Sequence, residues 1–363
     1  MEVPLTKTTR MKTSRLLGID LSYVISLMAT IAMSLFFVVG DRGNYLSHEH
    51  YFPFLDIFPA WFIFMNGLTT TLSLRDRRIS SRKLFSFTSK KGSMLFLIGL
   101  VFCPVWAVNI FVCCGIFYML APQIVKYSTS ILGVFAILLG LMSIALINLG
   151  VPTFVHFSTI ELSGSGPKEF IGFFLFNGYF SVLPWAVFFI VGLMVGRSHL
   201  QMKSLIGPSN MISFILIAAG VFLEKMTSGY YVNREITGIE GNIFLLQNKF
   251  FLPGFVVFAC GVCILLTNLC IYVMKDLENR KSISLLNAIS GSKYSIYVIH
   301  LLIGLFTTAI FTSESFKNRY VILVYIVIVC YACIWSVMAW KKRINELAPI
   351  EWMMKRLSGS VRN

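Results

Sequence analysis

Two histidines and an aspartate stand close together in the stretch SHEHYFPFLDIFPAWFIFMNG, residues 47–67. His48 and His50 precede Asp56, and the chain becomes strongly apolar and aromatic from Ile57 onward. A histidine beside a carboxylate can take a proton from a hydroxyl or an amine, because the carboxylate fixes the imidazole tautomer and stabilises the imidazolium that forms. These three residues are therefore the candidate catalytic group, with either histidine as the base and His50, the nearer to Asp56, preferred.

The same stretch also fits a plainer interpretation. Pro53 stands between His50 and Asp56, so helical periodicity cannot be used to bring the two side chains together. A short loop between two membrane spans is polar when it is exposed to water. From spacing alone, a solvated loop and a catalytic loop both remain open.

A few further polar residues lie within or beside apolar segments. Asn66 and Asn109 could orient the carbonyl group of a substrate, or each could bind a neighbouring helix. His300 follows Tyr294 and Tyr297 on one apolar segment, where packing or a helix-to-helix hydrogen bond is the alternative to chemistry. Asp20 stands at the start of the first apolar run, near the lipid headgroups or, if it lies deeper, in a functional site.

A metal site is not expected. All eight cysteines fall inside apolar segments: Cys103, Cys113, Cys114, Cys260, Cys263, Cys270, Cys330 and Cys333. Two pairs have the Cys-x-x-Cys spacing of zinc sites, but no charged residues accompany them. They are interpreted as small buried apolar residues, with no disulfide framework and no metal.

Composition predicts the class of protein that must position these residues. The chain has 363 residues, of which 56% are hydrophobic and 13% charged, and its mean hydropathy is +0.77. These values predict an all-α integral membrane protein, a polytopic helical bundle forming one domain over residues 1–363. The basic segments 1–16 and 341–363 are expected to be cytoplasmic, and the first span is expected to be uncleaved because no small-residue cleavage site follows it.

Apolar windows of about 20 residues predict about ten spans. They lie near residues 17–40, 54–74, 92–105, 108–122, 129–151, 172–196, 209–226, 250–273, 291–311 and 320–340. The stretch 94–121 could instead be one long span, but Pro104 and Trp106 in CPVWAVN favour a turn at an interface. Two short spans there also keep the basic segments GRSHLQMK and KDLENRK on the inner side.

Charge predicts the orientation. With ten spans and both termini in the cytoplasm, most of the 31 lysines and arginines fall on the inner side. Topology and contacts with membrane lipids thus explain most of the net charge of +15, and no nucleic acid is needed. The inner segment that contains Arg75, Arg77 and Arg78 could also attract a phosphorylated cofactor.

Several stretches together resemble a clan of membrane acyltransferases. They are RLLGIDLSYVISLMATIAMSLFFVVGD, LDIFPAWFIFMNGLTTTLSLRDRR, ILGVFAILLG, GYFSVLPWAVFFIVGLMVGR, SGSKYSIYVIHLLIGL and the tail APIEWMMKRLSG. The clan includes heparan-alpha-glucosaminide N-acetyltransferase, the bacterial YeiB-like proteins and, more distantly, the acyltransferase-3 O-acetylases. The likeness covers nearly the whole chain in short apolar motifs. Asp20 matches the acid of the clan's Asp-x-x-Arg-Gly motif, although Tyr23 and Val24 replace its arginine and glycine.

The resemblance implies a function for the opening residues. Members of the clan take acetyl-CoA from the cytoplasm and deliver the acyl group to a glycan on the other side. His48 or His50, together with Asp56, match the implicated catalytic positions. On this hypothesis Arg75, Arg77, Arg78 and Asp20 help to bind acetyl-CoA, and the bundle lies in a bacterial inner membrane. The acceptor sugar, the acyl chain and the choice between a covalent acyl-enzyme and direct transfer stay open, as does a homodimer.

Two other functions fit parts of the sequence. A carrier for a small or amphipathic solute would explain lone polar residues within the membrane and a basic inner face, although it should also have a polar line at the midplane, of which the sequence shows almost none. A catalytically silent relative that assists polysaccharide assembly would explain the altered Asp-x-x-Arg-Gly motif. Gly-x-Ser-x-Gly, P-loop and dinucleotide-binding motifs are absent from the sequence.

Overall fold

The computed structural model describes most of the chain: residues 7–41, 56–74, 81–106, 109–148, 171–177, 179–201, 206–232, 253–274, 280–310, 318–344 and 347–358. All regular elements in these ranges are helical, so the all-α prediction is confirmed for them. The longer helices are α1 (Lys7–Asp41), α2 (Ile57–Leu74), α3 (Ser81–Phe102), α4 (Phe111–Ile124), α5 (Thr129–Asn148), α8 (Val182–Gln201), α9 (Ile206–Val232), α11 (Pro253–Val273), α13 (Lys293–Ile310) and α14 (Arg319–Arg343). Shorter elements are the π-helical turn η2 (Phe173–Asn177), α12 (Arg280–Ser290) and α15 (Pro349–Ser358).

Within the described ranges, six helices are long and apolar enough to cross a membrane. They contain the segments Leu17–Phe36, Ile57–Leu74, Gly207–Met226, Gly254–Val273, Lys293–Ile310 and Tyr320–Arg343. A further three apolar segments are shorter, Phe111–Ile124, Thr129–Ala145 and Val182–Ser198. These helices indicate an integral membrane protein. Ten spans and cytoplasmic termini stay predictions.

Helices α3 and α4 form an antiparallel pair, which confirms the predicted turn in the stretch 94–121. A Cβ atom added at Gly92 would lie 2.6 Å from the backbone nitrogen of Met119, and one added at Gly99 would lie 2.6 Å from that of Val112. Early residues of α3 thus contact late residues of α4. The two backbones approach closely because glycine leaves room at the contact, as is common between membrane helices.

Helices α2 and α8 pack equally closely but run in the same direction. A Cβ atom at Gly192 would lie 2.1 Å from the carbonyl oxygen of Phe64, and one at Gly196 would lie 2.9 Å from that of Leu68, so the contacts advance along both helices together. Thr71 adds a hydrogen bond of 3.1 Å to the carbonyl oxygen of Leu193. This contact fixes the position of α2, the helix that carries Asn66.

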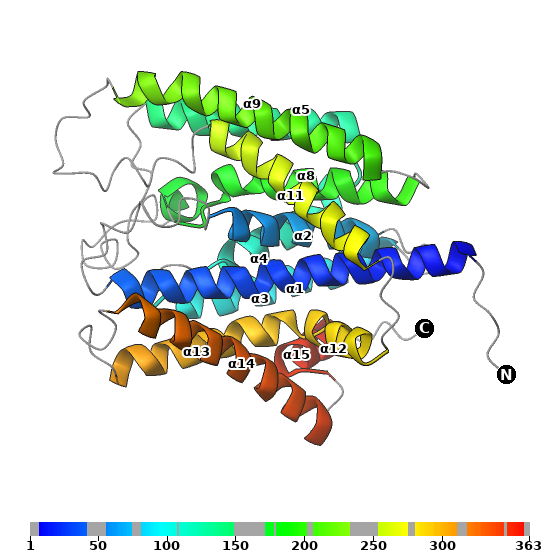
Figure 1. Cartoon of the computed structure of the whole chain (residues 1–363), viewed down its shortest axis with the longest axis vertical. Coiled ribbons are helices and arrows are strands. Elements are labelled where there is room, and N and C mark those ends of the chain that lie inside the picture. Colours follow the sequence, from blue (N-terminus) through cyan, green and yellow to red (C-terminus); the bar gives the residue numbers. More distant parts are fainter. Residues whose placement is uncertain are drawn as a thin grey trace.

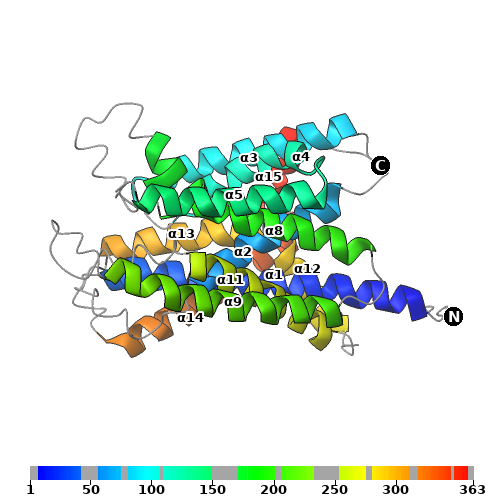
Figure 2. The same cartoon turned by 90° about the horizontal axis from the view of Figure 1, so that it is seen from above.

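The long helices run between two ends of the bundle (Figures 1 and 2). We call the end where α1 begins, and towards which α12 and α15 lie, the α12 end. Helix α8 ends there. Near its C-terminus, Arg197 donates hydrogen bonds to the carbonyl groups of Val125 and Tyr127, which follow α4. Since α2 is parallel to α8, its first turn lies at the opposite end, which we call the Asp56 end.

The predicted span 172–196 is divided in the structure. Its first part forms the turn η2, and α8 follows from Val182, with Leu183 in an extended conformation (φ −99°, ψ 131°) before the regular helical turns. Pro184 cannot donate a backbone hydrogen bond, which favours a break near it. The side chains of Ser181 and Trp185 bond to the carbonyl groups of Leu183 and Tyr179 at this break. The short helices α12 and α15 were not predicted by the apolar windows, because both are amphipathic and too short to span a membrane.

Candidate functional site

Asp56 is the part of the predicted catalytic group that the structure describes, and His48 and His50 lie outside the described residues. Asp56 is half-buried just before the first turn of α2. The hydroxyl of Tyr179 donates a hydrogen bond of 2.9 Å to its Oδ1 atom. The indole of Trp185 in turn donates a hydrogen bond of 2.9 Å to the carbonyl of Tyr179. The aspartate is thus held by residues at and just before the start of α8, at the Asp56 end of the bundle.

Asn66 lies deeper in the bundle, at the centre of a hydrogen-bonded group from four helices. Its Oδ1 atom accepts hydrogen bonds from the hydroxyls of Tyr23 (2.5 Å) and Tyr118 (2.6 Å). Its Nδ2 atom donates to the carbonyl of Phe62 at 2.8 Å, one turn earlier on α2. Tyr294 donates a hydrogen bond of 2.9 Å to the hydroxyl of Tyr118. We call Tyr23, Asn66, Tyr118 and Tyr294 the tyrosine cluster.

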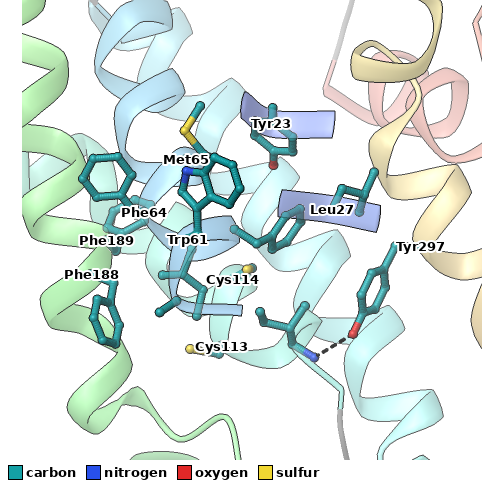
Figure 3. Packing of buried hydrophobic residues seen from close by; sticks show 14 of the residues in the cluster. Tyr23, Leu27, Trp61, Phe64, Met65, Cys113, Cys114, Phe188, Phe189 and Tyr297 are labelled. Atoms are coloured by element: carbon teal, nitrogen blue, oxygen red, sulfur yellow. Dashed lines mark hydrogen bonds between the residues drawn. The ribbon is translucent and has the colours of Figure 1, made fainter. Parts of the chain in front are cut away.

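The tyrosine cluster is buried against aromatic side chains. All four of its residues are at most 3% exposed. The ring of Tyr23 meets the ring of Phe62 edge-on, with centroids 5.4 Å apart. Figure 3 shows Tyr23, Cys114 and Tyr297 reaching from different helices into this interior. Because water is excluded there, each hydroxyl depends on its partner in the cluster.

Two lysines lie on the faces of the cluster's tyrosines. The Nζ atom of Lys91, from α3, lies 3.9 Å from the ring centroid of Tyr118 and 4.9 Å from that of Tyr294. The Nζ atom of Lys293, the first residue of α13, lies 3.8 Å from the centroid of Tyr23 and 5.4 Å from that of Tyr294. At these distances, cation–π attraction stabilises an ammonium group that has lost part of its hydration.

A carboxylate from α15 holds the start of α13 beside the lysines. Oε1 of Glu351 accepts hydrogen bonds from the backbone nitrogens of Tyr294 (2.8 Å) and Ser295 (3.3 Å). Oε2 accepts a hydrogen bond from the hydroxyl of Ser295. A carboxylate is well placed at a helix N-terminus, because free backbone N–H groups point towards it. Glu351 therefore positions both Lys293 and Tyr294.

His300 is fully buried between aromatic rings on α13. Its ring centroid lies 4.4 Å from that of Tyr297 and 6.1 Å from that of Trp106, with edge-on geometry in both cases. Trp106 is fixed by a hydrogen bond of 2.8 Å from its indole nitrogen to the hydroxyl of Ser34. Neither ring nitrogen of His300 has a side-chain partner within the described residues, and the ring interacts with the backbone of Tyr297 about one turn earlier on α13. A buried imidazole with so few polar partners is uncommon.

Asn109 has local partners at the turn between α3 and α4. Its Nδ2 atom donates a hydrogen bond of 2.9 Å to the carbonyl of Gly99, and its Oδ1 atom accepts one of 3.0 Å from the backbone nitrogen of Phe111. It thereby joins the end of α3 to the start of α4. In this structure Asn109 stabilises the turn, which is the helix-binding alternative that the sequence left open.

The predicted cofactor residues are only partly described. Arg75, Arg77 and Arg78 lie outside the described residues. Asp20 is half-buried on α1, next to the hydroxyl of Ser290 and close enough to Lys293 to attract its charge. It therefore belongs to the same region as the lysines, on the side that faces the α12 end.

The structure brings Asp20 and Asn66 into one neighbourhood and keeps Asp56 apart from it. Asp56, just before α2, and Asn66, in the middle of α2, are ten residues apart along the chain, a distance of roughly 15 Å at the rise of an α-helix. The candidate site therefore has two regions. One is the rim at the Asp56 end, and the other is the tyrosine cluster with its lysines on the side of the α12 end.

Sequence reasoning missed most of the second region. It counted Lys91 and Lys293 as topology signals and treated Tyr294 as a neighbour of His300. One signal could have singled out these lysines, because each directly adjoins an apolar run, whereas Arg75, Arg77 and Arg78 stand in a strongly charged stretch. Lysines at such positions can fold back along the helix into the bundle.

The cysteines form no metal centre in the part of the chain that the structure describes. All eight thiols are free, and seven of them are buried. Groups of three or more histidine, cysteine, aspartate or glutamate side chains are not found within the described ranges.

Comparison with known proteins adds no relative. No protein family, curated protein or solved structure matches this chain. What the fold establishes is the class of an all-helical integral membrane protein with polar regions inside its bundle.

Proposed function

We propose that this protein is a membrane-bound acyltransferase, which moves an acyl group, acetyl in the first instance, from cytoplasmic acyl-CoA to a sugar or glycan on the extracytoplasmic side. The observation that carries the proposal is the presence of two polar regions at different depths of one bundle. A cationic, tyrosine-lined region faces the α12 end, and a carboxylate held by Tyr179 stands at the other end. Transfer across a membrane needs a donor region and an acceptor region of this kind.

In the proposed orientation, the α12 end faces the cytoplasm of a bacterial inner membrane. The positive-inside bias supports it, because most lysines and arginines then lie on the inner side. The acyl-CoA would approach the tyrosine cluster from this side, and the acceptor would approach Asp56 from the other. Asp20 and the inner arginines Arg75, Arg77 and Arg78 keep their proposed role near the donor.

The proposed chemistry is a single acyl transfer. His50 or His48, oriented by Asp56, accepts the proton of the acceptor hydroxyl or amine as its oxygen or nitrogen attacks the thioester carbonyl. The carbon–sulfur bond then breaks, the sulfur leaves as thiolate and takes up a proton, and the products are the acylated acceptor and free CoA. No metal takes part in this scheme.

The contacts of the interior residues change the roles that we propose for them. Asn66 and Asn109 use their amide groups to hold neighbouring helices, so they act in the proposal by positioning. His300 has ring nitrogens without a side-chain partner in the described part of the chain. It is therefore our candidate for orienting the carbonyl of the passing thioester.

The surroundings of Tyr23, in the stretch that matches the Asp-x-x-Arg-Gly motif, also support a cationic donor site. Tyr23 stands where the resembling family has an arginine, yet the Nζ atom of Lys293 lies 3.8 Å from the centre of its ring. A positive charge is thus present near this place, supplied by α13. This contact supports an active enzyme over a catalytically silent relative.

The test replaces His48 and His50 by alanine, one at a time, and compares surface glycans by mass spectrometry. Loss of a general base typically lowers a rate by about a hundredfold or more. We expect one variant to lose the acetylated glycan and the other to keep it, which makes the second histidine the matched control. Unimpaired acetylation in both variants would contradict the assignment.

A carrier for a small amphipathic solute is the second candidate, and the tyrosine cluster is the observation that favours it. Polar side chains from four helices meet inside the bundle, which is more interior polarity than the sequence suggested. A carrier would move its solute across vesicle membranes without acyl-CoA. Solute uptake that is independent of acyl-CoA, with no acylated product, would favour the carrier over the enzyme.

A further inference from the structure

The ring of Tyr294 has two ammonium groups beside it, one from each of two helices. The Nζ atoms of Lys91 and Lys293 both lie within 5.4 Å of its centre. Each also rests on a second tyrosine ring of the cluster, Tyr118 for Lys91 and Tyr23 for Lys293. The two ammonium groups repel each other electrostatically, so a negative partner that binds both would stabilise them.

The neighbouring carboxylates are already engaged. Glu351 accepts three hydrogen bonds from the first turn of α13, and Asp20 lies against Ser290. Glu351 attracts both lysines electrostatically and Asp20 attracts Lys293, but no ion pair within 4 Å joins either lysine to a carboxylate among the described residues. A lysine ammonium has three N–H donors, and a tyrosine face satisfies this group incompletely. Donors therefore remain for an oxyanion.

Part of each lysine residue remains exposed, and a ligand would have to approach from that side. Lys91 and Lys293 are half-buried, whereas the tyrosines beneath them are at most 3% exposed. Their neighbour Lys341 is committed elsewhere, since its Nζ atom donates to the carbonyl of Ala288 and the hydroxyl of Ser292, both at 3.3 Å. Among the described lysines of this region, Lys91 and Lys293 therefore keep the most open donors.

We propose that Lys91 and Lys293, above the ring of Tyr294, form a binding site for the phosphate group of a ligand that enters from the α12 end. A phosphate has several strongly accepting oxygens and more negative charge than a carboxylate, so it can bind both ammonium groups at once. The inference deepens the proposed function and rests on it for the identity of the ligand, because an acyl-CoA donor carries phosphates. A phospholipid headgroup has the same chemistry.

The experiment measures binding to the whole protein in nanodiscs of a neutral lipid. Coenzyme A, adenosine 3′,5′-bisphosphate and phosphate-free pantetheine are the probes, and Lys91→Gln and Lys293→Gln are the variants. We expect the Kd of the two phosphate-bearing probes to rise about tenfold in each variant, with pantetheine unaffected. Lys90→Gln is the matched control, because Lys90 is the exposed neighbour of Lys91 and should leave every Kd unchanged.

A second arm separates the two sources of phosphate. Retention of anionic phospholipid is measured after purification into the same nanodiscs. Weak binding of coenzyme A together with lipid retention that falls in both lysine variants would support the phosphate site and assign it to a headgroup. Lys91→Arg and Lys293→Arg keep the charge and are expected to restore most of the binding, which guards against misfolding as the cause.

The inference and the proposed function can fail separately. Equal Kd values and equal lipid retention in Lys91→Gln, Lys293→Gln and Lys90→Gln would overturn the phosphate site, whatever the transferase assay gives. Lysine-dependent binding of coenzyme A without any acyl transfer would support the site and contradict the enzyme.

Discussion

Asp56 stands just before α2 and Asn66 in the middle of that helix, and their surroundings differ. Asn66 is 1% exposed, and its oxygen and nitrogen are both used by groups from other helices or from its own. Asp56 is half-buried at a rim and is held by Tyr179 from the start of α8. A saturated interior network stabilises a bundle, whereas a carboxylate at a rim keeps access to a reacting partner.

The comparison separates two kinds of effect. Changes in the tyrosine cluster should lower the free energy of unfolding, and changes at the Asp56 end should lower activity with little effect on stability. Lys91 and Lys293 lie between these extremes, because they touch the saturated network and still offer donors.

Replacing Asn66 by alanine should have the largest effect on stability. The change leaves the hydroxyls of Tyr23 and Tyr118 buried without their acceptor, at a cost of about 3 kcal/mol for the two together. Thermal unfolding in detergent measures the loss. Thr69→Ala is the control on the same helix, because the Thr69 hydroxyl bonds within α2 alone and sits at its partly exposed side. Equal unfolding temperatures for the two variants would show that the cluster does not stabilise the bundle.

Replacing Glu351 by alanine should have an intermediate effect. It removes the acceptor of two backbone N–H groups at the start of α13, and loss of such a cap costs about 1 to 2 kcal/mol. Because Lys293 and Tyr294 stand on this first turn, phosphate-bearing ligands should also bind more weakly. Met353→Ala, at an exposed position of the same helix α15, should change neither property. Normal stability and binding in Glu351→Ala would remove α15 from the site.

Replacing Tyr179 by phenylalanine should have the smallest effect on stability. One partly exposed hydrogen bond to Asp56 is lost, worth about 1 kcal/mol. Acetyl transfer should nevertheless fall several-fold, because the carboxylate loses a group that orients it. Tyr127→Phe, at an exposed tyrosine outside both regions, should leave transfer intact. A Tyr179→Phe enzyme that is strongly destabilised but fully active in its folded fraction would show that the Asp56 end contributes to stability and not to activity.

Much of the fold could be predicted from the sequence, because apolar runs of helical length are a strong signal. The helices α2, α9, α11, α13 and α14 begin and end within a few residues of the predicted spans, apart from the C-terminal extension of α9. The turn around Pro104 was predicted because proline cannot continue a helix. Helix α3 instead begins at Ser81, eleven residues before the predicted span, since its basic first half is helical but too polar for an apolar window.

The candidate site was harder to predict because its contacts join distant parts of the chain. Asn66 was named from its position in an apolar helix, but its partners Tyr23 and Tyr118 come from other helices and follow no local pattern. Lys293 gains its place from Glu351, which bonds to the neighbouring Tyr294 and Ser295 across 57 and 56 residues, so this placement depends on how α15 folds back. The role of Asp56 stays a prediction, since His48 and His50 lie outside the described residues.

The most direct test of the account is acetyl transfer across a sealed membrane. The purified protein is reconstituted into vesicles with labelled acetyl-CoA on the side of the α12 end and an acceptor glycan on the other side. Protease protection of the termini establishes which side that is. The account predicts labelled glycan with the wild-type protein and at least a tenfold lower yield with Asp56→Asn, at unchanged unfolding temperature. Labelled glycan formed equally well by Asp56→Asn, or no transfer by well-folded wild-type protein with any acceptor glycan, would contradict it.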